Sequence, residues 1–387
     1  MRKGFLKHLI IYILLWLPAT LYARIKFRFS PKMAPRIAGP FLLVSNHNSA
    51  YDMLMVAASF FRHMYFVAGE HIFRFGFSSK LIEWAFAPIS KTKGTTDSTS
   101  AINVIKTLKK GRNVCIFAEG NCSFNGVTGR LHPTTGRLAK MSGVTLVTYR
   151  LEGVYLAKPR WSIYFRYGRT SGSVVNVYSP ETLRKMTAEE IDAAIAKDVY
   201  ENAFQRQREY PVRFRGRALA EKLEEALYIC PACGGLATLS SRENEFSCTC
   251  GFSVRYGEYG FFNKGAPFET VYDWDRWQGE KLREVSDAYG EGAVFTDGGQ
   301  MLYSISSDHS EELAAEGKLT MYNDRIEIGD FKVRLDDIAQ MAIVLKQNIV
   351  FTALGKNYEI RSGHYRSGRK YLSLFNYRKN AVSAVRK

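Results

Sequence analysis

The stretch that decides the fold reads Phe41-Leu42-Leu43-Val44-Ser45-Asn46-His47-Asn48-Ser49-Ala50-Tyr51-Asp52. Its apolar, β-leaning start predicts a buried strand, and the pattern from Ser49 to about Phe61 predicts a helix. His47 therefore lies in the turn that leaves a strand, and Asp52 lies in the first turns of the helix. Catalytic groups of α/β domains often occupy such strand ends, where a rigid sheet fixes an exposed loop.

His47 and Asp52 are candidates for a general-base pair. A histidine accepts a proton near neutral pH, and a carboxylate bound to its other nitrogen would fix its tautomer and orientation. Five positions on one regular helix would separate the side chains by roughly 140°, so the pair can meet only if His47 precedes the helix. The alternative is that Asp52 is the N3 acid of a capping box begun by Ser49, with His47 an ordinary loop residue.

The N-terminal segment combines basic and apolar residues. The chain has 387 residues, which suggests two or three domains, and 54 basic against 37 acidic residues give a charge of +17 that favours an anionic partner. Residues 1–40 contain eight Lys and Arg and no Asp or Glu, around the most apolar stretch, Leu9 to Ala23. This composition is typical of a membrane-surface element near anionic lipid.

The apolar stretch is short for a transmembrane span. Fifteen residues make a helix of roughly 22 Å, Pro18 interrupts them, and the hydrocarbon core measures about 30 Å. The segment has no convincing small-x-small cleavage site, which argues against a signal peptide. We expect a retained anchor that dips into one leaflet at the cytoplasmic face of the cell membrane; a true span and a buried core helix are the alternatives.

A second loop, like the first, is expected to follow a buried strand. Residues 98–110 are expected to form an amphipathic helix and Val114–Phe117 a buried strand that ends in Ala118-Glu119-Gly120-Asn121. A second functional loop could thus lie on the same sheet edge as His47. Further elements are expected as strands at Gly143–Tyr149 and Trp161–Tyr167, a helix from the capping box Thr187-x-x-Glu190 to about Arg208, and a helix that ends near Tyr228.

Residues 59–90 are dense in aromatic side chains. We expect most of them to be core. A tunnel for an acyl chain is a second hypothesis, because a long apolar ligand needs an apolar lining.

Four cysteines form two pairs with the spacing of a metal site: Cys230-x-x-Cys233 and Cys248-x-Cys250. Tetrahedral zinc takes four thiolates from two such turns, and the adjacent glycines let the backbone tighten around the sulfurs. We expect structural zinc and no organic cofactor; a redox Cys-x-x-Cys or chance pairing is the alternative. The cluster fits a reducing compartment. Between the pairs Arg242 is the one basic residue, offset by Glu243 and Glu245, which argues against nucleic-acid binding.

From about residue 258 onward the pattern changes to short β-like runs. A hairpin is expected at Lys318–Ile328 with Asn323-Asp324 at its tip, followed by strands at Ile343–Thr352 and Lys356–Ile360. The strand pattern looks like a pleckstrin-homology-like β domain. Eight basic residues there could face anionic lipid or form a solvated basic face: Lys346, Lys356, Arg361, Arg366, Arg369, Lys370, Arg378 and Lys379.

In the sequences of these two loops, the chain resembles the glycerolipid acyltransferases typified by 1-acylglycerol-3-phosphate acyltransferase. Their signature is Asn-His-x4-Asp followed by Phe-Pro-Glu-Gly-Thr. Residues Asn46 to Asp52 match the first motif fully, and Phe117-Ala118-Glu119-Gly120-Asn121 matches the second in part. The resemblance covers roughly residues 20–215. It implies an α/β fold with an acyltransferase-type mixed sheet, flanking helices and a membrane-associated N-terminal helix, to which the zinc ribbon and the small β-rich domain are added.

The resemblance also implies roles for single residues. His47 would deprotonate the acceptor hydroxyl, Asp52 would hold His47, and no covalent acyl-enzyme would be needed. Asn46, Glu119, Gly120 and Asn121 would lie near the acceptor, and the family's basic acceptor-binding position would fall on Lys91. The departures are Lys91 where the family usually has Arg, Asn121-Cys122 where it has Thr-Arg, and Pro133-Thr134-Thr135-Gly136 without the usual lysine; Arg130 and Arg137 are candidates to compensate.

We therefore expect four segments. These are 1–30, a basic and apolar membrane segment; 31–215, an acyltransferase domain; 216–257, a helix and zinc ribbon; and 258–387, a β-rich domain. The leading hypothesis is an O-acyltransferase that moves an acyl group from acyl-CoA or acyl-carrier protein to a lysophospholipid-like alcohol at the phospholipid surface. The alternative is a non-catalytic lipid-binding adaptor on the same fold.

Overall fold

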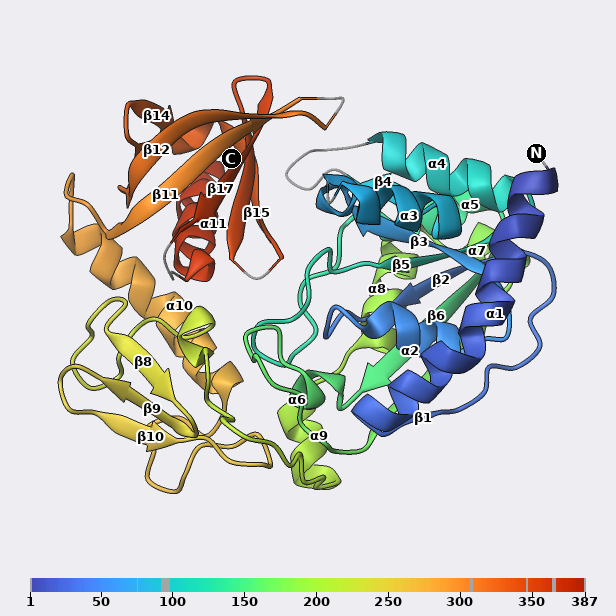
Figure 1. Ribbon diagram of the computed structural model, residues 1–387, viewed down its shortest axis with the longest axis horizontal. Helices are drawn as coiled ribbons and strands as arrows, with labels where there is room; N and C mark the ends of the chain where they lie inside the picture. The colour runs from blue at the N-terminus through green and yellow to red at the C-terminus, as the bar shows by residue number, and fades with distance from the viewer. Residues whose placement is uncertain are drawn as a thin grey trace. The chain divides into compact units, whose positions relative to one another are not determined.

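The strand expected at Phe41 lies at the centre of a seven-stranded sheet (Figure 1). It is β2 (Phe41–Ser45), and all five of its residues are buried. The strand order is β1-β7-β6-β2-β5-β3-β4, parallel throughout except for the β6–β7 pair. In the register of β2 and β5, Ser45 faces Phe117. Because the two strands are parallel, the loops that follow them leave from the same edge of the sheet.

The computed structural model describes residues 2–74, 76–91, 98–306, 309–345, 347–363 and 367–385. The chain divides into two units, of which the first comprises Met1–Lys91, Asp97–Leu219 and Gly257–Phe261. Its other elements are α1 (Arg2–Phe27), β1 (Phe29–Pro31), α2 (Asp52–Ser59), β3 (Met64–Gly69), η1 (Glu70–Arg74), α3 (Phe77–Phe86), β4 (Ile89–Lys91), α4 (Ser98–Lys109), β5 (Asn113–Phe117), α5 (Thr135–Ser142), β6 (Thr145–Glu152), α6 (Val154–Ala157), β7 (Thr170–Tyr178), α7 (Pro180–Lys185), α8 (Ala188–Val199) and α9 (Ala203–Glu209).

The N-terminal helix is longer than expected. α1 has 26 residues and continues through Pro18, so at 1.5 Å per residue it extends roughly 39 Å. Residues 4–27 are long and apolar enough to cross a membrane. One side of α1 nevertheless packs on α2 and α3 of the first unit. Tyr12 donates to the carbonyl of Phe60 (2.7 Å) and Trp16 to that of Ala57 (3.1 Å), which satisfies carbonyl groups at the C-terminal end of α2.

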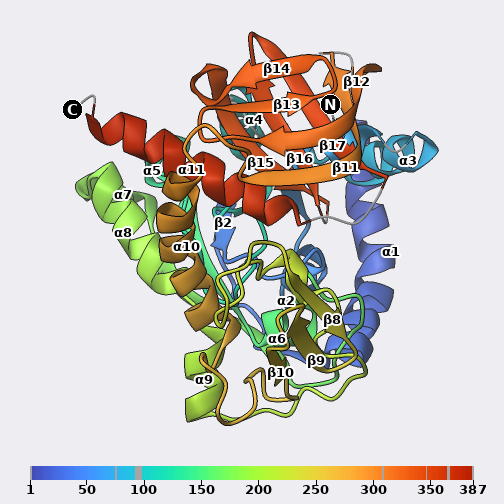
Figure 2. The ribbon, with the colours of Figure 1, turned by 90° about the vertical axis from the view of Figure 1, so that its left-hand side faces the viewer.

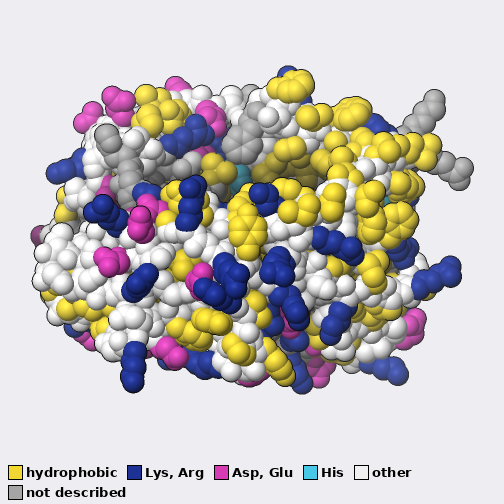
Figure 3. Space-filling model, turned by 60° about the horizontal axis from the view of Figure 1, so that its bottom comes forward, with side chains coloured by type: hydrophobic (Ala, Val, Ile, Leu, Met, Phe, Trp, Pro, Cys, Tyr) yellow, Lys and Arg dark blue, Asp and Glu magenta, His cyan; other side chains and the backbone are white. Residues whose placement is uncertain are grey.

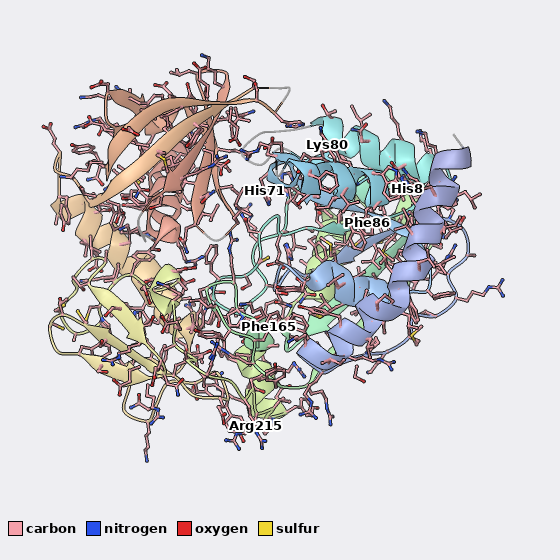
Figure 4. The ribbon with its side chains drawn as sticks, viewed as in Figure 1. His8, His71, Lys80, Phe86, Phe165 and Arg215 are labelled. Carbon is pink, nitrogen blue, oxygen red and sulfur yellow. The ribbon has the colours of Figure 1, made fainter. Side chains whose placement is uncertain are left out.

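The outward sides of α1 and α3 form one apolar surface. Its residues are exposed large hydrophobics: Leu6, Ile10, Ile13, Leu14, Leu17, Leu21 and Ile25 of α1, and Phe77, Leu81, Trp84 and Phe86 of α3. Figure 3 shows hydrophobic side chains gathered over the N-terminal helix, and Figure 4 labels His8 on α1 and Phe86 at the end of α3. The expectation that most aromatics of residues 59–90 are core is therefore wrong for α3, whose aromatics face outward.

His63 lies where α1 meets the sheet. Its ring contacts Phe5, His8 and Tyr12 of α1, and its Nδ1 has no hydrogen-bond partner among the described residues. Burial lowers the pKa of His63 to about 4, and the charges of His8 and Arg112 act in the same direction. His63 is therefore neutral in the folded protein at neutral pH.

This depressed pKa predicts an acid-sensitive fold. Between pH 6.5 and pH 4 the unfolded chain binds a proton at His63 that the folded chain does not bind, so stability falls as the pH falls through this window, by up to about 3 kcal/mol. We expect His63→Phe to flatten the pH dependence of the urea midpoint in this range. His309→Gln, at an exposed position, is the control. A wild-type slope retained in His63→Phe would contradict the prediction.

Several local expectations are confirmed and two are wrong. The capping box at Thr187 and Glu190 is present and opens α8, but the helix stops at Val199. A new helix, α9, begins at Ala203, because the Asn202 side chain accepts hydrogen bonds from its first amides. The strand expected at Trp161–Tyr167 is instead a loop, in which buried Trp161 donates from Nε1 to the Tyr155 hydroxyl (3.1 Å).

The second unit is built mainly from Ala220–Tyr256 and Phe262–Lys387. A three-stranded antiparallel sheet carries the order β10-β9-β8, and a seven-stranded antiparallel sheet the order β14-β13-β12-β11-β17-β16-β15. The elements are η2 (Leu223–Glu225), β8 (Leu239–Arg242), β9 (Glu245–Cys248), β10 (Ser253–Arg255), α10 (Val271–Ala288), β11 (Phe295–Ile305), β12 (Glu311–Met321), β13 (Arg325–Ile328), β14 (Phe331–Arg334), η3 (Leu335–Asp337), β15 (Ile338–Val344), β16 (Asn348–Ala353), β17 (Lys356–Ser362) and α11 (Gly368–Val385).

Left-handed backbone positions explain two differences from expectation. The helix expected to end near Tyr228 is reduced to η2, because Ala218 (φ 48°) and Lys222 (φ 71°) interrupt the helical path. The single strand expected at Ile343–Thr352 is the hairpin β15–β16, whose turn includes Leu345 at φ 52°. The hairpin with Asn323-Asp324 at its tip is confirmed as β12–β13.

One hydrophobic core joins the cysteine-containing segment to the C-terminal sheet. Tyr228 and Ile229, which precede Cys230, pack with Leu282 of α10 and with the buried faces of β11 to β17. Trp274 of α10 donates to the carbonyl of Ile229 (3.0 Å). α11 packs on β15 and β16 and meets α10 (Figure 2). The expected fold class, an α/β mixed sheet with flanking helices, an apolar N-terminal helix, a cysteine cluster and a β-rich C-terminal region, is confirmed; the pleckstrin-homology-like assignment stays a prediction.

The basic residues of the tail are mostly paired within the unit. Arg361 bonds Glu311 and Glu359, Arg369 and Lys370 pair with Asp275 and Asp297, Arg378 pairs with Asp287, and Lys379 binds carbonyl oxygens at Leu335 to Ile338. These pairs hold α11 and the sheet in place, so the expected lipid-facing basic patch is wrong for these five. Lys356 is exposed, and Lys346 and Arg366 lie outside the described residues.

Candidate active site

The first loop brings His47 and Asp52 together. His47 Nδ1 lies 2.8 Å from Asp52 Oδ2, with His47 in the turn after β2 and Asp52 as the first residue of α2. Asp52 is fully buried, whereas 21% of the His47 side chain is exposed. The carboxylate fixes the proton on Nδ1, so that Nε2 is the nitrogen left to accept a proton.

Asp52 is also the anchor of its own loop. Its Oδ2 accepts from the amides of Asn48 (2.5 Å) and Ser49 (3.0 Å), and its Oδ1 accepts from the Ser49 hydroxyl (3.1 Å). The carboxylate therefore holds the helix start and orients His47 at the same time. The capping and catalytic interpretations of this residue do not exclude each other.

Glu119 ties the first loop to a second one. Its Oε1 accepts from the His47 amide (2.7 Å) and its Oε2 from the Gly129 amide (2.7 Å). Burial raises the pKa of Glu119 to about 7, although both amides favour its ionised form. Because both oxygens bind backbone, Glu119 positions the loops on its two sides. The expectation that Glu119 lies near the acceptor stays a prediction.

Asn46 is a structural residue. It is fully buried, its Nδ2 donates to the Leu151 carbonyl (2.8 Å), and its Oδ1 accepts from the Leu151 amide (2.8 Å). The side chain thus pairs with the backbone of β6 at the strand end. It thereby holds the loop that carries His47, and its expected place among the substrate-binding residues stays a prediction.

The remaining residues of the second motif form a turn beside the histidine. Gly120 has φ 72°, a left-handed conformation that glycine adopts without strain. The Asn121 Oδ1 accepts from Arg160 Nη1 (3.4 Å), and the Arg160 guanidinium lies 4.4 Å from the centre of the Phe124 ring. Sequence reasoning missed Arg160, which lies after α6, outside both motifs.

Two further side chains lie against the His47 ring. Phe117 stacks on it, with ring centres 4.5 Å apart, and Cys122 Sγ lies 3.3 Å from Nε2 and 3.7 Å from Nδ1. Burial of the ring favours neutral imidazole. Cys122 and the hydrogen bond that His47 donates to Asp52 outweigh burial and raise the pKa of His47 to about 10. In the sequence Cys122 was noted only as a departure from the family pattern.

A cavity of about 360 Å³ lies between the loop 128–133 and α8. Arg130 and His132 line it on the loop side, and Asp192 on the helix side. Burial lowers the pKa of His132, and the charge of Lys91 acts in the same direction, so Lys91 lies close to this loop. Two of the cations considered for the acceptor, Lys91 and Arg130, thus belong to the same neighbourhood.

Comparison with known proteins shows a similarity that is confined to part of the chain. Residues 24–152, which include both loops, match the model of the acyltransferase family. Among solved structures, the chain is similar to the 1-acyl-sn-glycerophosphate acyltransferase PlsC from Thermotoga maritima, with 15% identity, a TM-score of 0.39, and coverage of 48% of this chain and 78% of that one. A search of curated proteins gave no match.

Outside the acyltransferase domain, the four paired cysteines come together. The Sγ atoms of Cys230, Cys233, Cys248 and Cys250 all lie within 4.8 Å of one another. Cys230 to Cys250 and Cys233 to Cys248 each span 3.8 Å. A tetrahedron with metal–sulfur bonds of about 2.3 Å has edges of about 3.8 Å, so the four thiols fit a tetrahedral metal ion.

The backbone around the sulfurs is shaped like two metal-binding turns. Gly234 (φ 70°) and Gly251 (φ 93°) occupy left-handed positions, and their amides donate to the carbonyls of Cys230 (2.9 Å) and Cys248 (3.0 Å). The Thr238 hydroxyl lies 3.1 Å from Cys248 Sγ. Such contacts orient metal ligands and offset thiolate charge.

Proposed function

We propose that the protein is an O-acyltransferase of glycerolipid metabolism. It moves a fatty acyl group from acyl-CoA or acyl-carrier protein to the hydroxyl of a lysophospholipid-like acceptor, with 1-acylglycerol-3-phosphate the first candidate by resemblance. The observation that carries the proposal is the His47–Asp52 pair, fixed by two backbone amides at the strand end of an acyltransferase-family domain.

In this proposal the neutral form of His47, which is the minor form at neutral pH because the pKa of His47 is raised, is the general base. Its Nε2 takes the proton of the acceptor hydroxyl as the oxygen attacks the thioester carbonyl, and the imidazolium then protonates the thiolate that leaves. Asp52 stabilises the imidazolium through Nδ1. Lys91 and Arg130 are the proposed partners of an acceptor phosphate, which a cation binds by charge and hydrogen bonds.

The reaction is proposed to take place at a membrane surface. The apolar surface of α1 and α3 is larger than scattered single exposed residues, and such contiguous surfaces mark membrane or protein contacts. Basic residues accompany it, and Lys7 lies 4.8 Å from the centre of the Trp84 ring, so the rim of the surface suits anionic phospholipid. We place this surface on the cytoplasmic leaflet, which carries such lipid.

The cysteine cluster is proposed to hold structural zinc. Four thiolates at tetrahedral spacing select zinc among common divalent ions. With four protein ligands no position is left for a substrate, so we assign the ion a structural role. No organic cofactor is proposed.

The test is a transfer assay with the full-length protein in phospholipid vesicles. Labelled acyl-CoA and acyl-carrier protein serve as donors, and a panel of lysophospholipids serves as acceptors. We expect transfer to at least one acceptor and its loss in His47→Ala. No transfer from either donor to any acceptor, by folded protein that binds the same vesicles, would favour the lipid-binding adaptor, for which the altered second motif is the supporting observation.

A further inference from the structure

The cavity between the loop 128–133 and α8 carries charged groups on both of its walls. Its volume of about 360 Å³ is in the range of small-molecule sites. Arg130 and His132 line it on the loop side, and Asp192 lines it on the helix side. The proposed phosphate contact uses Arg130, so the helix side is left for a further group of the ligand.

Backbone hydrogen bonds fix the loop wall of this cavity. The Thr128 amide donates to the carbonyl of Glu201, two residues after the end of α8 (2.9 Å). The His132 amide donates to the Ala118 carbonyl (2.9 Å). The cavity is thus a preformed part of the first unit, which lowers the cost of ordering when a ligand binds.

The helix wall offers a carboxylate oxygen to a ligand. Asp192 Oδ1 accepts from the amide of Gly136 in the first turn of α5 (2.6 Å). Among the described residues, Asp192 Oδ2 has no hydrogen-bond donor. A ligand that brings N–H donors and a positive charge to this wall would supply one.

We infer that the cavity binds the ammonium headgroup of the acceptor. The acceptor is then a lysophospholipid whose phosphate carries a short amino alcohol, and lysophosphatidylethanolamine is the simplest such lipid. Arg130 binds the phosphate and Asp192 binds the ammonium. This inference rests on the proposed function and deepens it, because it names the acceptor class.

The charges of the two walls suit a zwitterion. A phosphodiester carries one negative charge and its ammonium one positive charge, and these pair with Arg130 and Asp192. The monoester of 1-acylglycerol-3-phosphate approaches two negative charges at neutral pH, and it brings no cation for Asp192. Because like charges placed together disfavour a ligand, Asp192 selects against the monoester.

The lining favours a primary over a quaternary ammonium group. Quaternary ammonium ligands are bound by cages of aromatic rings. Among the described residues that line the cavity, Tyr200 is the one Phe, Tyr or Trp, and it is 46% exposed. A primary ammonium offers three N–H donors instead, which suit the Asp192 carboxylate.

A single carboxylate connects this cavity to the proposed base. Gly129 lines the cavity and donates its amide to Glu119 Oε2 (2.7 Å). The His47 amide donates to Oε1 of the same residue (2.7 Å). A headgroup in the cavity and a hydroxyl at His47 can therefore belong to one acceptor molecule.

The cavity lies on the side of the sheet away from α1. Leu42 and Val44 of β2 belong to the core that includes Ile191 of α8. Phe41 points to the opposite face of β2, where its ring lies 5.9 Å from that of Phe60, whose carbonyl binds α1. Figure 2 shows α1 and α8 on opposite sides of the sheet. An acceptor whose acyl chain enters from the α1 side thus reaches the cavity with its polar end.

The test is a transfer assay with the full-length protein in vesicles, both donors, and four acceptors that share one acyl chain. The acceptors are lysophosphatidylethanolamine, lysophosphatidylcholine, lysophosphatidylglycerol and 1-acylglycerol-3-phosphate. We expect kcat/KM to be highest for lysophosphatidylethanolamine, by about tenfold or more over each of the others.

Two variants and a matched control locate this preference. Asp192→Asn keeps an oxygen for the Gly136 amide and removes the charge, so kcat/KM for lysophosphatidylethanolamine should fall about tenfold or more and the preference should disappear. Ala196→Phe, at an exposed position of the lining, should fill the cavity with the same result. Glu189→Gln removes an exposed carboxylate on the same helix, outside the lining, and should keep the preference.

Loss of the preference in both variants and its retention in Glu189→Gln would support the headgroup site. No preference in the wild type, a preference that survives in both variants, or equal losses for all four acceptors in Asp192→Asn would overturn the site and leave the proposed function standing. No transfer from either donor to any acceptor, by folded protein, would overturn the proposed function and with it this inference.

Discussion

Asp52→Asn is expected to lower the rate of acyl transfer on the order of 10³-fold while the first unit stays folded. The amide cannot carry the negative charge that stabilises the imidazolium, and it favours the wrong tautomer of His47 when its nitrogen faces Nδ1. The measurement is kcat and KM with acyl-CoA and the best acceptor of the panel. We expect the loss in kcat, because Asp52 is fully buried and acts through His47.

A smaller substitution in the same loop separates orientation from folding. Ser49→Ala removes the hydroxyl that donates to Asp52 Oδ1 (3.1 Å) and accepts from the Tyr51 amide (3.1 Å), and it leaves the bond between Oδ2 and His47 intact. A hydrogen bond to a charged group contributes about 1.5–3 kcal/mol, so the rate should fall by about 10- to 100-fold, less than in Asp52→Asn. Equal losses in Ser49→Ala and Asp52→Asn, or equal falls in melting temperature, would mean that Asp52 matters only for the loop.

The sequence allowed the catalytic pair to be predicted because its parts are local. An apolar strand, a turn and a helix start fix the positions of His47 and Asp52 within six residues. The convergence of the two loops was also predictable, since buried parallel strands end at one sheet edge. The partners of Asn46 and Glu119 were not predictable, because Leu151 and Gly129 reach them through strand order and loop closure over distances in sequence that no local pattern encodes.

The same distinction explains the failures. Pro18 is a helix breaker by local rules, yet α1 continues through it, and the contacts of Tyr12 and Trp16 with α2 offset the missing hydrogen bond. The aromatics of α3 match a core pattern in composition, but their exposure depends on what covers them. Cys122 was visible as a departure from a motif, but its position beside the His47 ring follows from the meeting of the two loops and was not predictable.

Removal of the proposed zinc ion is expected to have the largest effect on stability, and the effect should be confined to the second unit. Metal binding contributes about 10 kcal/mol or more to the folding of small zinc sites. Here Tyr228 and Ile229 continue from the cysteine cluster into the core of the C-terminal sheet. Loss of the turn at Cys230 would therefore loosen that core, and we expect the second unit to melt roughly 10 °C lower or more.

The measurement is scanning calorimetry of the wild type, of Cys230→Ser and of chelator-treated protein, with metal content determined in parallel. We expect one zinc ion per chain in the wild type, and cobalt that replaces it should show the absorption spectrum of a tetrahedral thiolate site. When zinc is restored to the chelator-treated protein, the second unit should again melt at the wild-type temperature. Thr238→Val, which removes only the hydroxyl contact to Cys248 Sγ, should shift the transition far less. All proposed catalytic residues lie in the first unit, so transfer should survive; metal-free protein with unchanged melting would refute the zinc assignment.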